Sequence, residues 1–182
     1  MAEEIKDGTG TGNKMRVNSK NQASTFSVVE TEDKSINRDG RQWSLSFSTT
    51  PVGAGDYFFY LENTGTVDIT ITDIRTMCAA AETIDIDWVS GTPSYTADAD
   101  ITPVPKNGGS SKIPTAIAKL DTDITGLTDG GKIFFQRLDT ANKMEHIRTS
   151  ANIIIPQGTA LGLKATTGTA LITCTVSIVE LD

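Results

Sequence analysis

The sequence is short of the residue types from which catalytic sites, metal centres and membrane spans are built. Its 182 residues include one histidine and two cysteines, and aromatic residues make up only 6%. No run of about 18 apolar residues occurs, so no membrane-spanning helix is expected. The first seven residues lack the apolar segment of a secretory signal, which predicts synthesis in the cytoplasm.

The two cysteines, Cys78 and Cys174, both fall in strand-like runs of the sequence. Cytoplasmic proteins rarely hold disulfides, and free cysteine behaves as a small apolar residue, so we expect two buried thiols. The alternative is a disulfide that joins strands far apart in the sequence. Neither cysteine has a Cys-x-x-Cys partner or a histidine at ligand spacing, which argues against a metal site.

Basic residues are outnumbered by acidic ones, 16 against 23, which gives a net charge of −7. An acidic surface is repelled by phosphate backbones, so nucleic acid is not an expected partner. The length fits one domain. A hydrophobic fraction of 37% with few aromatic residues favours a thin two-layer β-sandwich over a thicker α/β core.

Residues 1–24 are predicted to form an extended N-terminal arm, either flexible or ordered by a partner. Residues 7–13 are glycine-rich and apolar-poor, whereas Lys14, Arg16 and Lys20 make the second half basic. The stretch from Gly8 to Lys14 has the glycine content of a phosphate-binding loop. It lacks the Gly-Lys-Ser/Thr ending and a preceding buried strand, so the arm is the better interpretation.

Residues 25–182 are predicted to form an all-β domain, because apolar residues recur with a period of two. Trp43, Leu45 and Phe47 alternate with serines, and residues 57–61 form a continuous run of large side chains that is typical of a strand buried on both faces. Further strands are expected at residues 26–31, 68–78, 83–89, 112–120, 132–138, 153–155, 161–165 and 171–181. The last two are expected to pair as a hairpin around residues 167–168.

The remaining segments are predicted to form turns and polar loops. A turn is expected at residues 37–40 and loops at 91–111, 121–131 and 139–150, and any helix should be short and lie within 75–82, 116–120 or 142–147. The resulting antiparallel β-sandwich is predicted to be a jelly roll, with an immunoglobulin-like sandwich as the alternative.

No group of residues meets the requirements of a known catalytic centre, so we predict no catalytic site. His146 has only Glu145 beside it, and no Gly-x-Ser-x-Gly motif occurs, so a surface histidine in a loop is expected. Residues 121–126 have the opening spacing of a calcium loop, but Lys132 stands where the loop needs a bidentate glutamate. A calcium site of another geometry stays open.

Asp85 and Asp87 lie two apart on a predicted strand and could serve as the paired acids of a glycosidase. Alternation alone also gathers polar residues on an exposed face, and we favour that interpretation here and for Asp98 and Asp100. No cofactor and no metal ion are therefore expected.

Aromatic residues offer one candidate contact site. Trp43 and Trp88 fall on apolar strand faces, which favours core packing over the stacking of sugars, and Tyr57 and Tyr60 lie in an apolar run. Tyr95, in the long loop, is the best exposed candidate and would suit a carbohydrate-binding module.

Several segments resemble small virion proteins of tailed bacteriophages, across about half of the chain. They are RVNSKN at residues 16–21, FSVVETE at 26–32, NRDG at 37–40, YFFYLENTG at 57–65 and IIIPQGTAL at 153–161. The resemblance implies a β-sandwich or jelly-roll protein that decorates, or cements, a capsid as a homotrimer. It implies no catalytic residues.

The resemblance predicts binding to the major capsid protein at capsomer junctions, on the surface of a virion assembled in the host cytoplasm. Lys14, Arg16 and Lys20 are then candidates to dock on an acidic shell, with Tyr95 as a further contact. The alternatives are a tail, baseplate or head-fibre component, or a carbohydrate-binding module.

Overall fold

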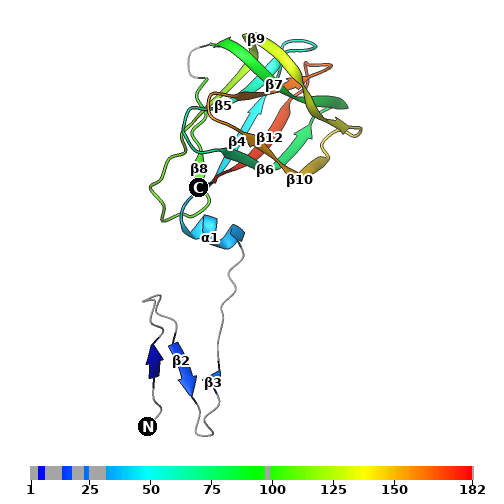
Figure 1. Cartoon of the computed structure of the whole chain (residues 1–182). Coiled ribbons are helices and arrows are strands. Elements are labelled where there is room, and N and C mark those ends of the chain that lie inside the picture. The colour runs from blue at the N-terminus through cyan, green and yellow to red at the C-terminus, as the bar shows by residue number, and fades with distance from the viewer. Residues whose placement is uncertain (1–3, 7–13, 18–22, 25–31, 97–98, 182) are drawn as a thin grey trace. The chain divides into compact units, whose positions relative to one another are not determined.

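A computed structural model describes residues 4–6, 14–17, 23–24, 32–96 and 99–181 (Figure 1), with side chains for 34–96, 99–146 and 153–181. The chain divides into two units, Met1–Ser35 and Ile36–Asp182. The predicted strand at residues 26–31 and the candidate Lys20 lie outside the described residues. No helix in the described part is long and apolar enough to cross a membrane.

The first unit contains a small antiparallel sheet with the strand order β1-β2-β3. Its strands are β1 (Glu4–Lys6), β2 (Lys14–Val17) and β3 (Ala23–Ser24). The register places Ile5 opposite Met15 and Val17 opposite Ala23. The candidate residues Lys14 and Arg16 therefore belong to the central strand of this sheet.

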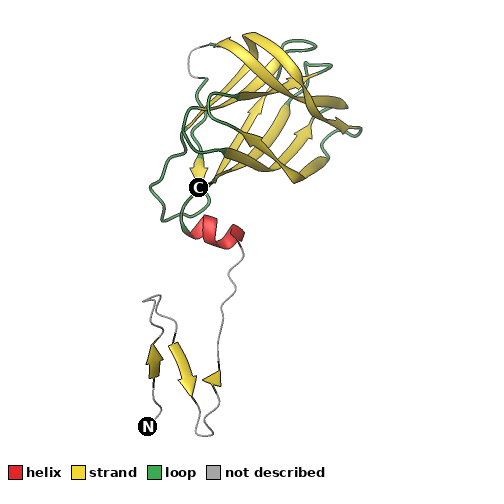
Figure 2. Cartoon of the chain, in the orientation of Figure 1, coloured by secondary structure: helices red, strands yellow, loops and turns green. Residues whose placement is uncertain are grey.

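A single short helix, α1 (Glu32–Arg38), precedes the sandwich in the described chain, as Figure 2 shows. The predicted turn at residues 37–40 begins inside this helix. The amide of Gly40 donates to the carbonyl of Asn37 over 3.0 Å, and Gly40 has a φ of 72°. A glycine with positive φ ends the helix because a Cβ would be strained in that conformation.

The second unit is built from two antiparallel sheets. The first has the order β10-β6-β12-β4-β8 and the second closes on itself in the order β11-β5-β9-β7. The strands of the first sheet are β4 (Gln42–Thr49), β6 (Ile69–Cys78), β8 (Val104–Pro105), β10 (Met144–Ile155) and β12 (Ile172–Glu180). Those of the second are β5 (Tyr57–Asn63), β7 (Glu82–Ser94), β9 (Ala116–Leu138) and β11 (Ala160–Ala165).

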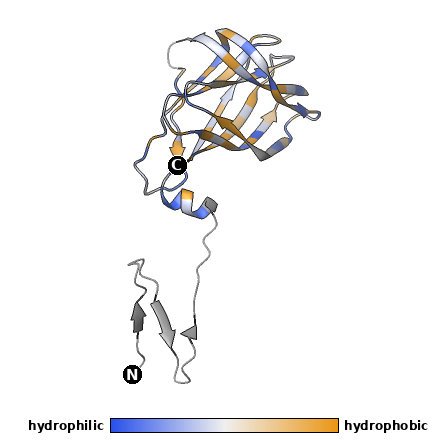
Figure 3. Cartoon of the chain, viewed as in Figure 1, coloured by the Kyte–Doolittle hydropathy of each residue, from blue (hydrophilic) through white to orange (hydrophobic). Residues whose placement is uncertain are grey.

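The strand order is that of a jelly roll. The chain passes from one sheet to the other at each step between β4 and β7 and again between β9 and β12. Between β7 and β9 it forms the short β8 in the first sheet, and β7 and β9 themselves pair within the second sheet. Apolar residues recur along the strands of both sheets (Figure 3). The prediction of an antiparallel, jelly-roll β-sandwich is confirmed, and its cause is the period-two alternation that gives each sheet one apolar face.

The main core fills the space between the two sheets. Trp43 and Leu45 are fully buried, and the rings of Phe47 and Phe59 stack from opposite sheets with centroids 4.9 Å apart. Alternate residues of the last strand face this core, and Cys174 is one of them. Both cysteines are free and buried, as the favoured interpretation predicted.

A second, smaller apolar cluster lies on the other face of β5, β7 and β11. It consists of Tyr57, Tyr60, Val89, Ile124 and Ala160. Ile124 comes from the middle of β9, which pairs with β5 in its first half and with β7 in its second. Because β9 curves across both neighbours, β5 is buried on both faces, as its sequence predicted.

Four sequence predictions are wrong, and two of them fail because β9 and β10 are far longer than their apolar runs. The expected loop at 121–131 lies within β9, and the expected polar segment at 139–150 is mostly strand. The three places expected to hold any helix, 75–82, 116–120 and 142–147, are largely strand as well. β11 and β12 lie in different sheets and form no hairpin. Polar residues are tolerated in these strands because backbone pairing, rather than side-chain burial, holds them in place.

The outward face of β4 and β12 carries the hydroxyl rows that the serine alternation predicted. The hydroxyls of Ser46 and Thr175 lie 3.0 Å apart, as do those of Ser48 and Thr173. These cross-strand pairs are directly opposite in the register. They reinforce the sheet on its solvent side without adding apolar surface.

We predict that Gly162→Ala destabilises the fold by about 1–3 kcal/mol, the usual cost of overpacking. A Cβ at Gly162 would meet the ring of Tyr57 at 2.7 Å and Val89 at 3.0 Å. Urea denaturation measures the loss. Gly108→Ala is the matched control, since a Cβ there meets nothing within 4 Å. Equal stability of the two variants would contradict tight packing beneath Tyr57.

Candidate functional site

The exposed aromatic candidate, Tyr95, lies just beyond β7 and is 40% exposed. The ammonium of Lys119 sits 4.3 Å from the centre of its ring. Lys119 also pairs with Asp100, and this hydrogen bond raises the pKa of the lysine. One face of Tyr95 is thus covered by a cation, which leaves less of the ring for stacking a sugar. Asp100 is exposed as expected, and Asp98 lies outside the described residues.

The structure contradicts the expectation that Asp85 and Asp87 line an exposed face. Asp87 is fully buried and Asp85 is 3% exposed. Both side chains lie on the face opposite the main core, but in the closed sheet they are packed against Tyr57 of β5, Lys132 of β9 and Lys164 of β11. Each carboxylate has a lysine partner, Lys132 at 2.6 Å from Asp85 and Lys164 at 2.6 Å from Asp87. Ion pairing is what allows two carboxylates to be buried there.

Asp87 is the centre of a polar network inside the second cluster. The Tyr57 hydroxyl donates to its Oδ2 over 2.9 Å, and Lys164 binds the same oxygen. Lys164 reaches on to Asp129 at 3.1 Å, and the backbone amide of Gly131 donates to that carboxylate. The network therefore ties β5, β7 and β11 to the bend of β9.

The pKa values of this network shift in the directions that burial and pairing require. Burial and the hydrogen bond to Asp87 raise the pKa of Tyr57. Desolvation would lower the pKa of Lys164, but hydrogen bonds to Asp87 and Asp129 outweigh it and raise the value. The hydrogen bond from Gly131, then that from Lys164, lowers the pKa of Asp129. The charged lysine and the neutral tyrosine are thus both stabilised by folding.

The two weaker sequence candidates are engaged in local contacts. Asp121, the first residue of the possible calcium loop, accepts bonds from the amides of Thr96 and Thr122 at 2.5 and 2.7 Å. Its segment is strand, and no group of three or more histidine, cysteine or acidic residues in the described chain could hold a metal ion. His146 lies in β10 rather than in a loop, and its Nε2 contacts Asp73.

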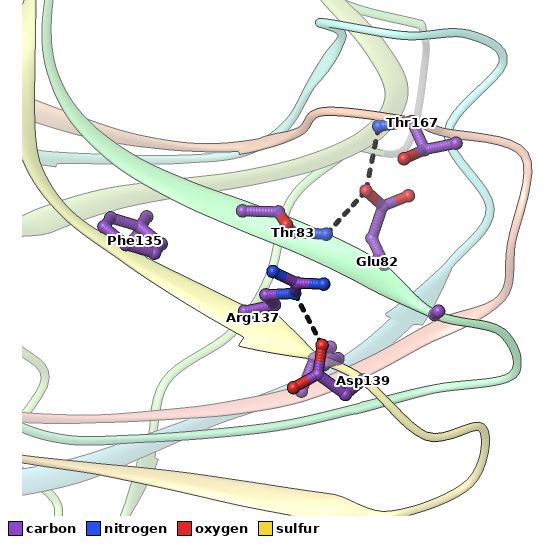
Figure 4. Close-up of a pocket in the computed structure, with 8 residues that line it drawn as sticks. Glu82, Thr83, Phe135, Arg137, Asp139 and Thr167 are labelled. Carbon is purple, nitrogen blue, oxygen red and sulfur yellow. Dashed lines mark hydrogen bonds and ion pairs between the residues drawn. The ribbon is translucent and has the colours of Figure 1, made fainter.

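A pocket of about 370 Å³ opens on the outer face of β7 and β9, beyond the buried network. Figure 4 shows its lining side chains. They include Glu82, Thr83, Phe135, Arg137, Asp139 and Thr167. The register pairs Arg137 with Thr83. No sequence motif predicts this pocket, because it depends on how the ends of β7 and β9 meet the turn after β11.

One wall of the pocket is fixed by Glu82, which is 4% exposed. Its carboxylate accepts hydrogen bonds from the backbone amides of Thr83, Thr167 and Gly168, each over 2.8 Å. These bonds hold the turn after β11 against the start of β7. Charge-assisted bonds of this kind are stronger than neutral ones, so the wall is rigid.

Residues 99–115 form a second exposed feature, here named the contact loop. It is fixed to β4, because Trp43 Nε1 donates to the carbonyl of Lys112 over 3.1 Å and the Lys106 amide donates to Gln42 over 2.9 Å. Val104 is 61% exposed and Ile113 80% exposed. The predicted long loop at 91–111 begins later than expected, because β7 runs on to Ser94. It is anchored to β4 by β8.

We expect Lys164→Met to lower the free energy of unfolding by about 3–5 kcal/mol, because it leaves Asp87 charged and buried without its partner. The double variant D87N/K164M removes both charges and should be more stable than the single one. Chemical denaturation at neutral pH measures both. If the double variant loses as much stability as the single variants Asp87→Asn and Lys164→Met lose together, the ion pair is not what holds the β9 bend.

Stability should fall in alkali. Folding raises the pKa of Tyr57 above its ordinary 10.0 and that of Lys164 above 10.5, so their contribution is complete below pH 10. It is lost as the pH rises toward the folded-state values. Denaturation midpoints from about pH 8 to about pH 11 test this. Burial also raises the pKa of Tyr60. Tyr57→Phe removes one of these groups and should flatten the decline; an unchanged slope would argue against Tyr57 as a source.

Comparison of the chain with models of protein families, with curated proteins and with solved structures finds no match. The functional proposal therefore rests on the residues of the chain, their contacts and their charges. The described surfaces best suited to carry one are the contact loop and the pocket beside Glu82.

Proposed function

We propose that this chain is a virion structural protein that decorates and cements the capsid of a tailed bacteriophage, bound as a homotrimer to the major capsid protein at capsomer junctions. The sequence resemblance suggests this role. The structural observation that supports it best is the contact loop, which presents exposed apolar side chains from a rigid position on the jelly roll.

The contact loop has the properties of a preformed binding surface. Val104 and Ile113 are among the most exposed large apolar residues of the described chain. Such residues favour interfaces when they are gathered in a patch. Hydrogen bonds to the side chain of Trp43 and to the backbone carbonyl of Gln42 already order the loop, so little conformational entropy remains to be lost on binding.

The fold suits a protein whose task is to stabilise a particle. The second sheet closes on itself and so leaves fewer unpaired strand edges, which limits unwanted edge-to-edge pairing. The basic residues of the arm, Lys14, Arg16 and Lys20, contrast with the net charge of −7 of the chain. In our proposal the arm and the contact loop dock on an acidic shell while the rest of the acidic jelly roll faces solvent.

A tail, baseplate or head-fibre protein would draw on the same rigid scaffold and exposed loop. The location of the chain on the particle separates these roles. Electron microscopy of the parent particle should place density for the chain at capsomer junctions of the head. Density confined to the tail or to a single fibre would contradict the proposal.

The contact loop is tested by adding purified protein to parent capsids that lack it. We expect V104D/I113D to weaken capsid binding by about tenfold or more, since a charge at an apolar contact costs at least about 1.4 kcal/mol. Val52→Asp is the matched control, because Val52 is 65% exposed and lies outside the loop. Equal binding by both variants would exclude the loop as the contact.

The arm and the oligomer are tested with the same capsids. Deletion of residues 1–24 should weaken binding if the basic arm docks on the shell, and unchanged binding would refute that part of the proposal. Light scattering of the intact chain should give the mass of a trimer. A monomer at working concentration would contradict the trimer but not the contact loop.

A further inference from the structure

We infer that the pocket beside Glu82 is a binding site for an uncharged sugar, one pyranose unit of a glycan. The proposal does not depend on capsid attachment, because the pocket residues lie outside the contact loop. It rests on three features of the pocket: an exposed aromatic ring, a paired donor and acceptor, and a rigid wall.

The aromatic surface comes from two adjacent residues of β9. Phe135 is 57% exposed and Phe134 is 47% exposed, and their rings are stacked with centroids 6.2 Å apart. An aromatic ring has a negative face. The C–H groups on one side of a pyranose carry partial positive charge and are apolar enough to displace water from such a ring. Phe135, which lines the pocket, provides this platform.

The polar component is the ion pair of Arg137 and Asp139, with Nε and Oδ1 2.5 Å apart. Both side chains are more than two-thirds exposed. A guanidinium offers several fixed N–H donors, and a carboxylate offers only acceptors. A sugar hydroxyl is both donor and acceptor, so two neighbouring hydroxyls can bind this pair together. In the view of Figure 4 the guanidinium lies between the ring of Phe135 and Glu82.

The size and charge of the pocket narrow the ligand class. A volume of about 370 Å³ is near the lower end for ligand sites, which span about 300–1,000 Å³. The charged residues that line it are Glu82, Arg137 and Asp139, whose charges sum to −1. A sulfated or sialylated glycan would be repelled, whereas a neutral sugar would not.

The rigid wall makes the site preorganised. Glu82 fixes the backbone of Thr83 and Thr167, both of which line the pocket, through hydrogen bonds of 2.8 Å. The backbone of this wall is thus held in place before any ligand arrives, which reduces the entropy lost on binding. Glu82 uses its carboxylate for this purpose and acts as a positioning residue rather than as a ligand contact.

The test is a microarray of neutral and acidic glycans probed with the intact chain, followed by calorimetric titration of the best neutral hit. We expect saturable binding to neutral glycans. Phe135→Ala and Arg137→Ala should each weaken it by about tenfold or more, the effect of losing one good contact. Both residues are exposed, so the variants should keep their strand content by circular dichroism.

Tyr95→Ala is the matched control, since it removes another exposed aromatic residue away from the pocket and should bind like the unaltered chain. The proposal is overturned by a lack of neutral hits, by preference for acidic glycans, or by loss of binding in Tyr95→Ala but not in Phe135→Ala. Capsid binding by Phe135→Ala should be unchanged, which keeps this result separable from the cement role.

Discussion

The arrangement of the second sheet depends on β11 being paired along both of its edges. β5 lies on one side and β7 on the other, and the side chains of β11 divide between the two apolar clusters. Leu161 and Leu163 enter the main core, and the alternate residues Gly162 and Lys164 must face the second cluster. Gly162 leaves room for Tyr57, and Lys164 requires carboxylate partners. The buried network follows from this one constraint.

The network also contacts the long strand β9. A strand of 23 residues must bend to pair with β5 at one end and β7 at the other. Within this stretch the Gly131 amide donates to Asp129, and Asp129 pairs with Lys164, which is the partner of Asp87. The same curvature brings Phe135 and Arg137 beside the start of β7, where the pocket opens. One buried ion pair thus influences both the fold and a candidate binding surface.

The contact surfaces of the molecule are separated from its structural centre. The contact loop is fixed to β4 in the first sheet, and the pocket lies on the second sheet, so a change in one need not disturb the other. This separation is useful in a protein that is proposed to bind a capsid through one surface and a glycan through another. Each surface is presented by paired backbone, which keeps its geometry constant.

Period-two alternation in the sequence was enough to determine the all-β class and the inward face of β4, because these follow from local patterning. It could not determine that Asp85 and Asp87 are buried, since their contacts, Tyr57, Lys132 and Lys164, lie at least 30 positions away in the chain. The pocket was likewise beyond prediction, because residues of β7, of β9 and of the turn after β11 meet only in the folded chain. Long-range pairing in three dimensions, which single-strand periodicity does not encode, decided these features.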